Sequence, residues 1–290
     1  MQNTQKYSKI IAGTMTWGSW GKKLPTNEIE GLINYCLETG IHTFDHADIY
    51  GDYGTEADFG KALKQSGVKR IDLQIITKCG IQMGHCRDNQ VAHYQYDADY
   101  IIWSAEQSLK NLQTDYIDLF LLHRPSPLMN PTEIIKGIQK LLDEGKIKQF
   151  GVSNFTPAQI QMLDTAIHVG ANQVEFSLTH DDPMYDGTFN DCMAKNRMAM
   201  SWSPLGNYFR EENEQNSRIK GVMNELKDKY NADESQLLLA FILKHPSAVH
   251  PVVGTATKER LKSSIEAVNI NLELKDWFKL LEASKGEPIP

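Results

Sequence analysis

Residues 116–123 read YIDLFLLH, a short apolar run that ends in a histidine. A segment of helical periodicity precedes it at 97–113, and another follows at 131–144, beginning with Pro131 and stopping before Gly145. Proline in the first turn and glycine after the last turn are ordinary helix boundaries. A short apolar run between two such helices is typical of a buried strand in a parallel sheet. The stretch therefore predicts one strand–helix unit of an α/β protein.

The same alternation continues in both directions along the chain of 290 residues. The expected strands lie at 9–14, 41–45, 71–77, 116–122, 148–152, 172–176, 198–202 and 249–253. The expected helices lie at 26–39, 54–66, 97–113, 131–144, 157–168, 186–195, 217–230, 233–244, 257–267 and 273–284. Eight such units with extra helices predict a closed (β/α)8 TIM barrel, with residues 1–290 forming a single domain. An open doubly wound sheet is the alternative, but its GxGxxG fingerprint is absent from the sequence.

Composition excludes several classes of partner. Hydrophobic residues make up 41% and charged residues 23% of the chain, and no apolar run approaches the length that a bilayer requires. The start MQNTQKYSKI lacks the apolar segment of a secretory signal, so we expect a cytoplasmic protein with no membrane partner. The net charge of -7 has the wrong sign for binding phosphates over a broad face, so no nucleic-acid partner is expected.

Cysteine and histidine spacing indicates no metal site. The four cysteines form no CxxC pair, which disfavours a zinc site and a disulfide framework; they are Cys36, Cys79, Cys86 and Cys192. His85 and His93 lie in the long segment 80–96 without a third ligand at a useful spacing, so we expect them at the surface. Segments 80–96 and 207–218 are expected to form rims or lids, since long loops of a barrel border its site. The alternative for 207–218 is a solvated charged loop.

Polar residues close three neighbouring strands of the expected barrel. The stretch FDHADIYG at 44–51 places Asp45 at the end of one strand and Tyr50 in the loop beyond it, while Lys78 and His123 end the next two. Alone, each has an ordinary explanation: a cap, a packing ring, a solvated lysine or a buried histidine. Because barrel active sites lie at the carboxyl ends of the strands, their joint occurrence predicts an active site there.

These residues resemble the aldo-keto reductase superfamily. GIHTFDHADIYGDYGTEADFG (40–60) looks like the first signature of that family, and SLKNLQTDYIDLFLLHRP (108–125) looks like its second. Further matches in the same order are ITKCG (76–80), GVSNF (151–155), NQVEFS (172–177), SWSPLG (201–206) and VVGTATKERLKSS (252–264). A series in the right order is a more specific signal than one short motif.

The resemblance implies a catalytic tetrad of Asp45, Tyr50, Lys78 and His123 and the reduction of a small carbonyl compound by hydride from NADP(H). Tyr50 would be the general acid that protonates the developing alkoxide. Lys78 would bring the pKa of the phenol toward the working pH, Asp45 would keep Lys78 charged, and His123 would orient the carbonyl.

The resemblance also implies a cofactor site without a Rossmann unit. Ser153, Asn154 and Gln173 would hold the carboxamide, and Trp202 would stack on the nicotinamide. Gly13, Thr14 and Met15 would line the nicotinamide side, Ser203, Pro204, Leu205 and Gly206 the pyrophosphate, and Gly254, Thr255, Arg260, Ser263 and Ser264 the adenosine phosphate. Because Thr255 and Arg260 offer donors suited to a phosphate, NADPH should be preferred over NADH. Many members carry lysine where this chain has Gly254, so NADPH should be held more weakly than in those relatives. Alternatively, Arg260 is a solvated cation that pairs with Glu259 or Glu266.

Two other functions are compatible with these motifs. One is a cofactor-binding regulatory subunit, like the channel-associated members of the superfamily. The other makes Lys78 a Schiff-base nucleophile, as in barrel aldolases, although an adjacent Asp45 that keeps the amine protonated opposes this. The sequence encodes no particular carbonyl substrate, and we expect a monomer or a weak homo-oligomer.

Overall fold

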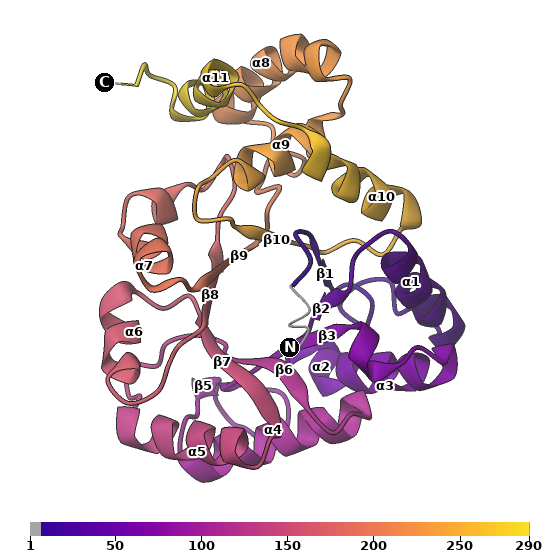
Figure 1. Ribbon diagram of the computed structural model, residues 1–290, viewed down its shortest axis with the longest axis vertical. Coiled ribbons are helices and arrows are strands. Elements are labelled where there is room, and N and C mark those ends of the chain that lie inside the picture. The colour runs from indigo at the N-terminus through magenta and orange to yellow at the C-terminus, as the bar shows by residue number, and fades with distance from the viewer. Residues whose placement is uncertain (1–6, 290) are drawn as a thin grey trace, which may run out of the picture.

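Residues 7–289 are described by a computed structural model, in which eight parallel strands close into a barrel (Figure 1). The strands are β1 (Ile11–Gly13), β2 (Thr43–Asp45), β3 (Gln74–Cys79), β6 (Ile117–Leu122), β7 (Ile147–Ser153), β8 (Ala171–Glu175), β9 (Met198–Trp202) and β10 (His250–Val253). They are hydrogen-bonded in the order β1-β10-β9-β8-β7-β6-β3-β2, and every neighbouring pair is parallel. The (β/α)8 barrel is therefore confirmed, and the open sheet is wrong.

Helices surround the barrel on its outside (Figure 1). They are α1 (Thr26–Glu38), α2 (Tyr50–Tyr53), α3 (Thr55–Ser66), α4 (Ala98–Leu112), α5 (Pro131–Asp143), α6 (Pro157–Asp164), α7 (Thr188–Lys195), α8 (Glu214–Tyr230), α9 (Glu234–Leu243), α10 (Lys258–Glu266) and α11 (Leu274–Lys285). The extra pair α8 and α11 lies side by side beyond α9. Between residues 7 and 289, no helix combines the length and the apolar character needed to cross a bilayer.

The expected start of the third strand is wrong. Residues Arg70–Asp72 form a 3-10 turn (η1) instead, and Ile71 is 71% exposed. Arg70 donates to the backbone carbonyls of Leu73 and Tyr116 at 2.8 and 2.9 Å, which holds this segment out of the sheet. The strand begins at Gln74 and continues to Cys79, so Lys78 lies at its carboxyl end, as expected.

Two other segments differ from expectation for local reasons. Segment 80–96 contains a small antiparallel hairpin of β4 (Ile81–Gln82) and β5 (His93–Tyr94). Helix α8 begins at Glu214 rather than near 217, because the Asn213 side chain caps it by accepting from the backbone N–H of Asn216.

A layer of apolar side chains fills the inside of the barrel; its buried members are Ile11, Ile76, Leu119, Leu121, Ala171, Met200 and Val252. Because side chains alternate along a strand, the residue two positions beyond each of these faces inward again. Lys78 therefore follows Ile76, and Gln173 follows Ala171, toward the carboxyl end of the barrel. Both are buried, so a polar layer lies directly on the apolar one.

Helix α3 approaches α4 closely at Gly60. A Cβ atom there would lie 2.1 Å from the Asn111 carbonyl oxygen and 2.8 Å from the Leu112 carbonyl carbon. Both are backbone atoms, which cannot yield without moving the helix. Gly31, in α1, has no heavy atom within 4 Å of the same position.

We expect Gly60→Ala to lower the free energy of unfolding by about 1–3 kcal/mol, since the added methyl overpacks a helix contact. The matched variant Gly31→Ala should instead raise it by about 0.5–1 kcal/mol, because alanine loses less chain entropy in a helix. Urea denaturation followed by circular dichroism measures both. A Gly60→Ala protein as stable as the original would contradict this packing.

Candidate active site

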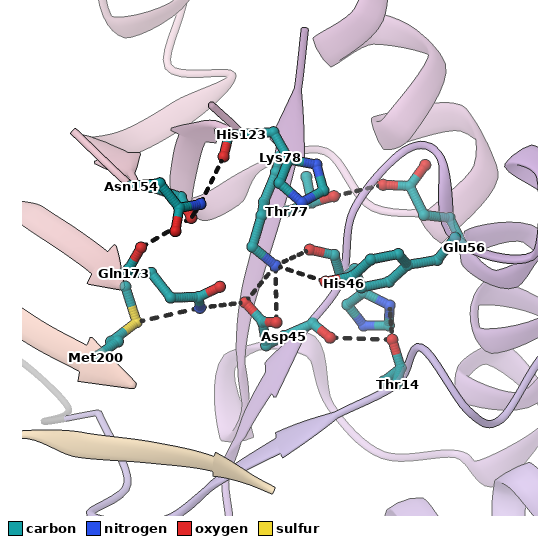
Figure 2. A network of polar contacts seen from close by, with 12 residues as sticks. Thr14, Asp45, His46, Glu56, Thr77, Lys78, His123, Asn154, Gln173 and Met200 are labelled. Carbon is teal, nitrogen blue, oxygen red and sulfur yellow. Dashed lines mark hydrogen bonds and ion pairs between the residues drawn. The ribbon is translucent and has the colours of Figure 1, made fainter. Parts of the chain in front are cut away.

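A buried ion pair lies at the centre of the polar layer. The Nζ atom of Lys78 is 2.8 and 2.7 Å from the two carboxylate oxygens of Asp45 and donates to the His46 carbonyl oxygen at 2.7 Å (Figure 2). Lys78 is 0% and Asp45 2% exposed. Burial alone would lower the pKa of Lys78, but Asp45 and Tyr50 outweigh it, and the pKa is raised. Lys78 is therefore a charged ammonium held in a fixed position.

The phenol of Tyr50 supplies the fourth oxygen atom around this ammonium. Lys78 Nζ donates to its oxygen at 3.2 Å. Tyr50 opens α2, which is not a regular helix: Gly51, Asp52 and Tyr53 have φ of +61°, +55° and +68°. Left-handed backbone costs a non-glycine residue roughly 1–2 kcal/mol. This strained turn directs the chain away immediately after Tyr50.

The electrostatics of Tyr50 combine opposing effects. Burial raises the pKa of the phenol, the charge of Lys78 lowers it, and Asp45 raises it; the net direction is upward. Lys78 thus acts in the direction expected from the sequence, but burial is the larger effect. The phenol is consequently protonated at neutral pH, as a proton donor must be.

The ring of His123 lies beside the phenol. Its centroid is 6.0 Å from that of Tyr50, and the planes meet at 79°. Burial, with the charges of Lys78 and Arg124, holds the pKa of His123 well below its usual range. Its Nδ1 atom is buried and has no hydrogen-bond partner in the described part of the chain. His123 is therefore a neutral imidazole with unused hydrogen-bonding capacity.

The residues expected to hold a carboxamide form one connected group next to Asp45. Gln173 donates to Asp45 Oδ1 at 2.9 Å, and the Ser153 hydroxyl donates to the Gln173 carbonyl at 2.8 Å. Asn154 donates to Ser153 Oγ at 2.9 Å and accepts from the indole N–H of Trp202 at 2.9 Å. The structure therefore brings all four residues together across β7, β8 and β9.

Residues at the end of β1 contact the site from behind. The hydroxyl of Thr14 donates to the Asp45 carbonyl at 3.0 Å and lies 2.8 Å from His46 Nδ1. Gly13 is packed closely, since a Cβ atom there would lie 3.0 Å from the Val252 side chain. Met15, by contrast, is at the surface, 42% exposed. Burial and Lys78 lower the pKa of His46 to about 3.

His46 was not identified as a site residue from the sequence, although a second polar residue immediately after Asp45 was a usable signal. Trp20 was missed as well. Its ring lies 6.2 Å from that of Tyr50, and its indole N–H donates to Asp52 at 3.0 Å. The sequence hinted at it only by placing a tryptophan in the loop after the first strand, at the expected carboxyl end of the barrel.

The loop Ser203–Gly206 turns tightly at the end of β9. Ser203 and Gly206 have φ of +49° and +55°, and the Gly206 N–H donates to the Ser203 carbonyl at 2.8 Å. A Cβ atom at Gly206 would lie 2.0 Å from the Thr179 hydroxyl, so only glycine fits. Pro204 is buried and Leu205 half-buried between them.

The loop after β10 is held from the β1 side. Thr16 donates to the Gly254 carbonyl at 3.0 Å, and the Trp17 indole donates to the Thr255 carbonyl at 2.9 Å. Arg260 is exposed in the first turn of α10, and its guanidinium makes no hydrogen bond or ion pair with any residue from 7 to 289.

Other charges and hydroxyls near Arg260 are already engaged. Glu266, one partner considered from the sequence, lies 3.8 Å from Lys262 instead. Ser263 donates to Asp233 at 2.7 Å, and Ser264 donates to the Arg260 carbonyl at 2.8 Å. These two hydroxyls are therefore turned toward the protein, as is that of Thr255, which accepts from the backbone N–H of Thr257 at 3.3 Å, whereas the Arg260 guanidinium is not.

Two buried acids lie behind β3 and were not expected from the sequence. Glu56 is 1% exposed and accepts from the Thr77 hydroxyl at 2.6 Å. Asp48 is 4% exposed; its backbone N–H donates to the Lys78 carbonyl at 3.0 Å, and its side chain accepts from Tyr100 at 3.4 Å. Burial, reinforced by Glu56, raises the pKa of Asp48 to about 8.

Asp48 predicts how stability varies with pH. Its pKa is about 8 in the folded chain, against about 3.9 in an unfolded one. The folded chain therefore binds the extra proton between these values, and its stability falls as pH rises through this interval. Asp48→Asn has no such titration. Relative to the original protein, its free energy of unfolding should therefore rise by about 1 kcal/mol or more as the pH is raised from about 5 to about 8. Exposed Asp115→Asn should not, and a pH-independent difference for Asp48→Asn would refute the assignment.

Comparison with known proteins identifies a family and a set of relatives that are similar in sequence or in fold. The model of the aldo/keto reductase family matches residues 9–285. YcsN, an uncharacterized oxidoreductase of Bacillus subtilis strain 168, is 36% identical over 292 residues, covering 98% of this chain and 97% of that protein. A 6-dehydroglucose reductase of Agrobacterium fabrum strain C58 is 33% identical over 297 residues, covering 100% of both. An aldo-keto reductase from Klebsiella pneumoniae, crystallised with NADPH, has the same fold: TM-score 0.75 at 23% identity, covering 98% of this chain and 92% of that one.

Proposed function

The chain belongs to the aldo/keto reductase family, and on that premise we propose that it is an NADP(H)-dependent oxidoreductase that reduces small aldehydes or ketones to alcohols. The observation that carries the proposal is the contact of one buried ammonium, Lys78, with both the carboxylate of Asp45 and the phenol of Tyr50. A neutral imidazole beside that phenol, His123, completes the arrangement. We further propose that the whole chain, 1–290, acts as a single domain.

The residues present fit a nicotinamide dinucleotide phosphate. Asn154 directly follows β7 and Gln173 lies within the neighbouring β8, so both bring side-chain amides that suit a carboxamide. The half-buried ring of Trp202 donates to Asn154. Arg260 offers an exposed guanidinium without a protein partner among residues 7–289, at the first turn of a helix, where anions are favoured. The NADPH bound to the Klebsiella pneumoniae enzyme supports the same cofactor here. When bound, the cofactor supplies the hydride.

Tyr50 and Lys78 then move the proton. The carbonyl oxygen gains negative charge as it is reduced, and the protonated phenol of Tyr50 donates to it. The phenolate left behind is stabilised by the adjacent charge of Lys78, which favours the ionised form. Asp45 keeps that charge in place from the opposite side.

His123 positions the substrate. A neutral imidazole can donate one N–H to the carbonyl oxygen without competing for the proton of Tyr50, and its low pKa keeps it neutral throughout the physiological range. The raised pKa of Lys78 opposes the Schiff-base alternative, because a protonated amine is not a nucleophile.

We expect Tyr50→Phe to lower kcat for a simple aldehyde by about 100-fold to 10,000-fold, since only the proton donor is lost. The dissociation constant for NADPH, measured by quenching of tryptophan fluorescence, should stay within about twofold of the original value, since the proton donor adds transition-state and not ground-state binding. Tyr116→Phe, which removes a phenol before β6 at the opposite end of the barrel, is the control and should change neither quantity. Near-normal turnover by Tyr50→Phe would contradict the proposed general acid. Tight NADPH binding without turnover by the original protein would favour the regulatory alternative.

The adenosine phosphate can be tested from both directions. Arg260→Ala should raise KM for NADPH roughly tenfold to hundredfold, the equivalent of a charge-assisted hydrogen bond, and leave KM for NADH and kcat nearly unchanged. Gly254→Lys should lower KM for NADPH, because no heavy atom lies within 4 Å of a Cβ atom there and a lysine adds charge. Lys262→Ala, on the exposed side of the same helix, is the control. An equal rise in KM for NADPH and NADH in Arg260→Ala would show that Arg260 does not bind the adenosine phosphate.

A further inference from the structure

The backbone of Arg124 is held in a fixed position at the rim of the site. It directly follows His123, and its backbone is bonded twice to the buried Tyr96. The Tyr96 hydroxyl donates to the Arg124 carbonyl at 2.6 Å, and the Arg124 N–H donates to the Tyr96 oxygen at 3.3 Å. The backbone of Arg124 is thus held in place from both of its polar groups.

The side chain of Arg124 extends across the rim to β9. Its guanidinium carbon lies 5.8 Å from the centroid of the Trp202 ring. Trp202 is itself held by its hydrogen bond to Asn154, which in turn donates to the His123 carbonyl at 3.2 Å. Arg124 therefore directly follows His123, which borders the proposed reacting carbonyl, and its guanidinium lies beside Trp202, which borders the proposed nicotinamide site.

The charge of Arg124 is not balanced by the protein. Its guanidinium forms no ion pair or hydrogen bond with the chain between residues 7 and 289, whereas Arg70 and Arg197 pair with aspartates at the barrel wall. Within the site, Lys78 and Asp45 neutralise each other. The guanidinium of Arg124 thus adds an unpaired positive charge at this rim, in a chain whose overall charge is -7.

We propose that Arg124 forms a subsite for an anionic group, so that the preferred substrates are aldehydes or ketones that carry a carboxylate at the end remote from the carbonyl. The planar guanidinium presents paired N–H donors that match the two oxygens of a carboxylate. Its contact with the Trp202 ring limits its freedom, so less entropy is lost on binding. The proposal rests on the proposed function, which supplies the reacting carbonyl between Tyr50 and His123.

Matched substrates test this subsite. Para-carboxybenzaldehyde and methyl para-formylbenzoate have the same reacting aldehyde and differ in one negative charge. The original protein should show roughly tenfold or greater kcat/KM for the acid over the ester, the value of a charge-assisted hydrogen bond, mainly through KM. Arg124→Met should abolish this preference and leave the ester unaffected. Arg124→Lys should restore part of it, because it keeps the charge and loses the paired donors.

A control variant and a binding measurement make the result decisive. Lys148→Met removes a cation that lies 5.0 Å from the Tyr116 ring near the amino end of β7, and it should leave the preference unchanged. Calorimetric titration with para-(hydroxymethyl)benzoate and its methyl ester measures the same discrimination without turnover. If neither aldehyde is reduced, the proposed function fails, and the titration still tests the subsite. Equal treatment of acid and ester by the original protein, or equal losses for both in Arg124→Met, would overturn the proposal.

Discussion

A buried ammonium must be matched by a buried carboxylate, and the pair Lys78–Asp45 meets this constraint inside the barrel. Neither residue is more than 2% exposed. Removing one partner of such a pair typically costs about 3–5 kcal/mol, because the other charge is left buried and unpaired. Parallel pairing of β2 with β3 places Asp45 opposite Ile76, so Lys78 is two residues further along and on the same inward face. The closed barrel therefore holds the two charges next to each other on its inner face.

The rest of the site is built outward from that pair. Gln173 of β8 contacts Asp45 from across the barrel, and His46 turns its carbonyl back to Lys78. The left-handed turn follows Tyr50 directly, and the phenol lies within hydrogen-bond distance of the ammonium. The same hydrogen bonds therefore secure the inside of the barrel and set the protonation states that the proposed chemistry needs: Lys78 charged, Tyr50 protonated and His123 neutral.

The sequence predicted features with local signals and missed those that depend on distant partners. All eight strands were placed because each apolar run has its own length and boundaries, and the four proposed catalytic residues stood out because each closes or follows a strand. The start of β3 was wrong because Arg70 finds its carbonyl partner at Tyr116, far along the chain. The engagement of Ser263 by Asp233 could not be seen for the same reason. The strained turn after Tyr50 left no clear pattern either, since Gly51 and Asp52 tolerate left-handed backbone in many loops and Tyr53 is an unusual residue for it.

The charge of Lys78 is the central claim, and single-turnover reduction of a simple aldehyde by NADPH in Lys78→Met tests it most directly. Circular dichroism of Lys78→Met shows whether a loss of activity reflects unfolding. The double variant Asp45→Asn/Lys78→Met, which removes both charges together and leaves none buried and unpaired, is the folded comparison. We predict that hydride transfer falls by about 100-fold or more in Lys78→Met, because the phenolate loses the charge that stabilises it, while NADPH still binds. Transfer within about threefold of the original rate, a difference of well under 1 kcal/mol in the barrier, would contradict the account.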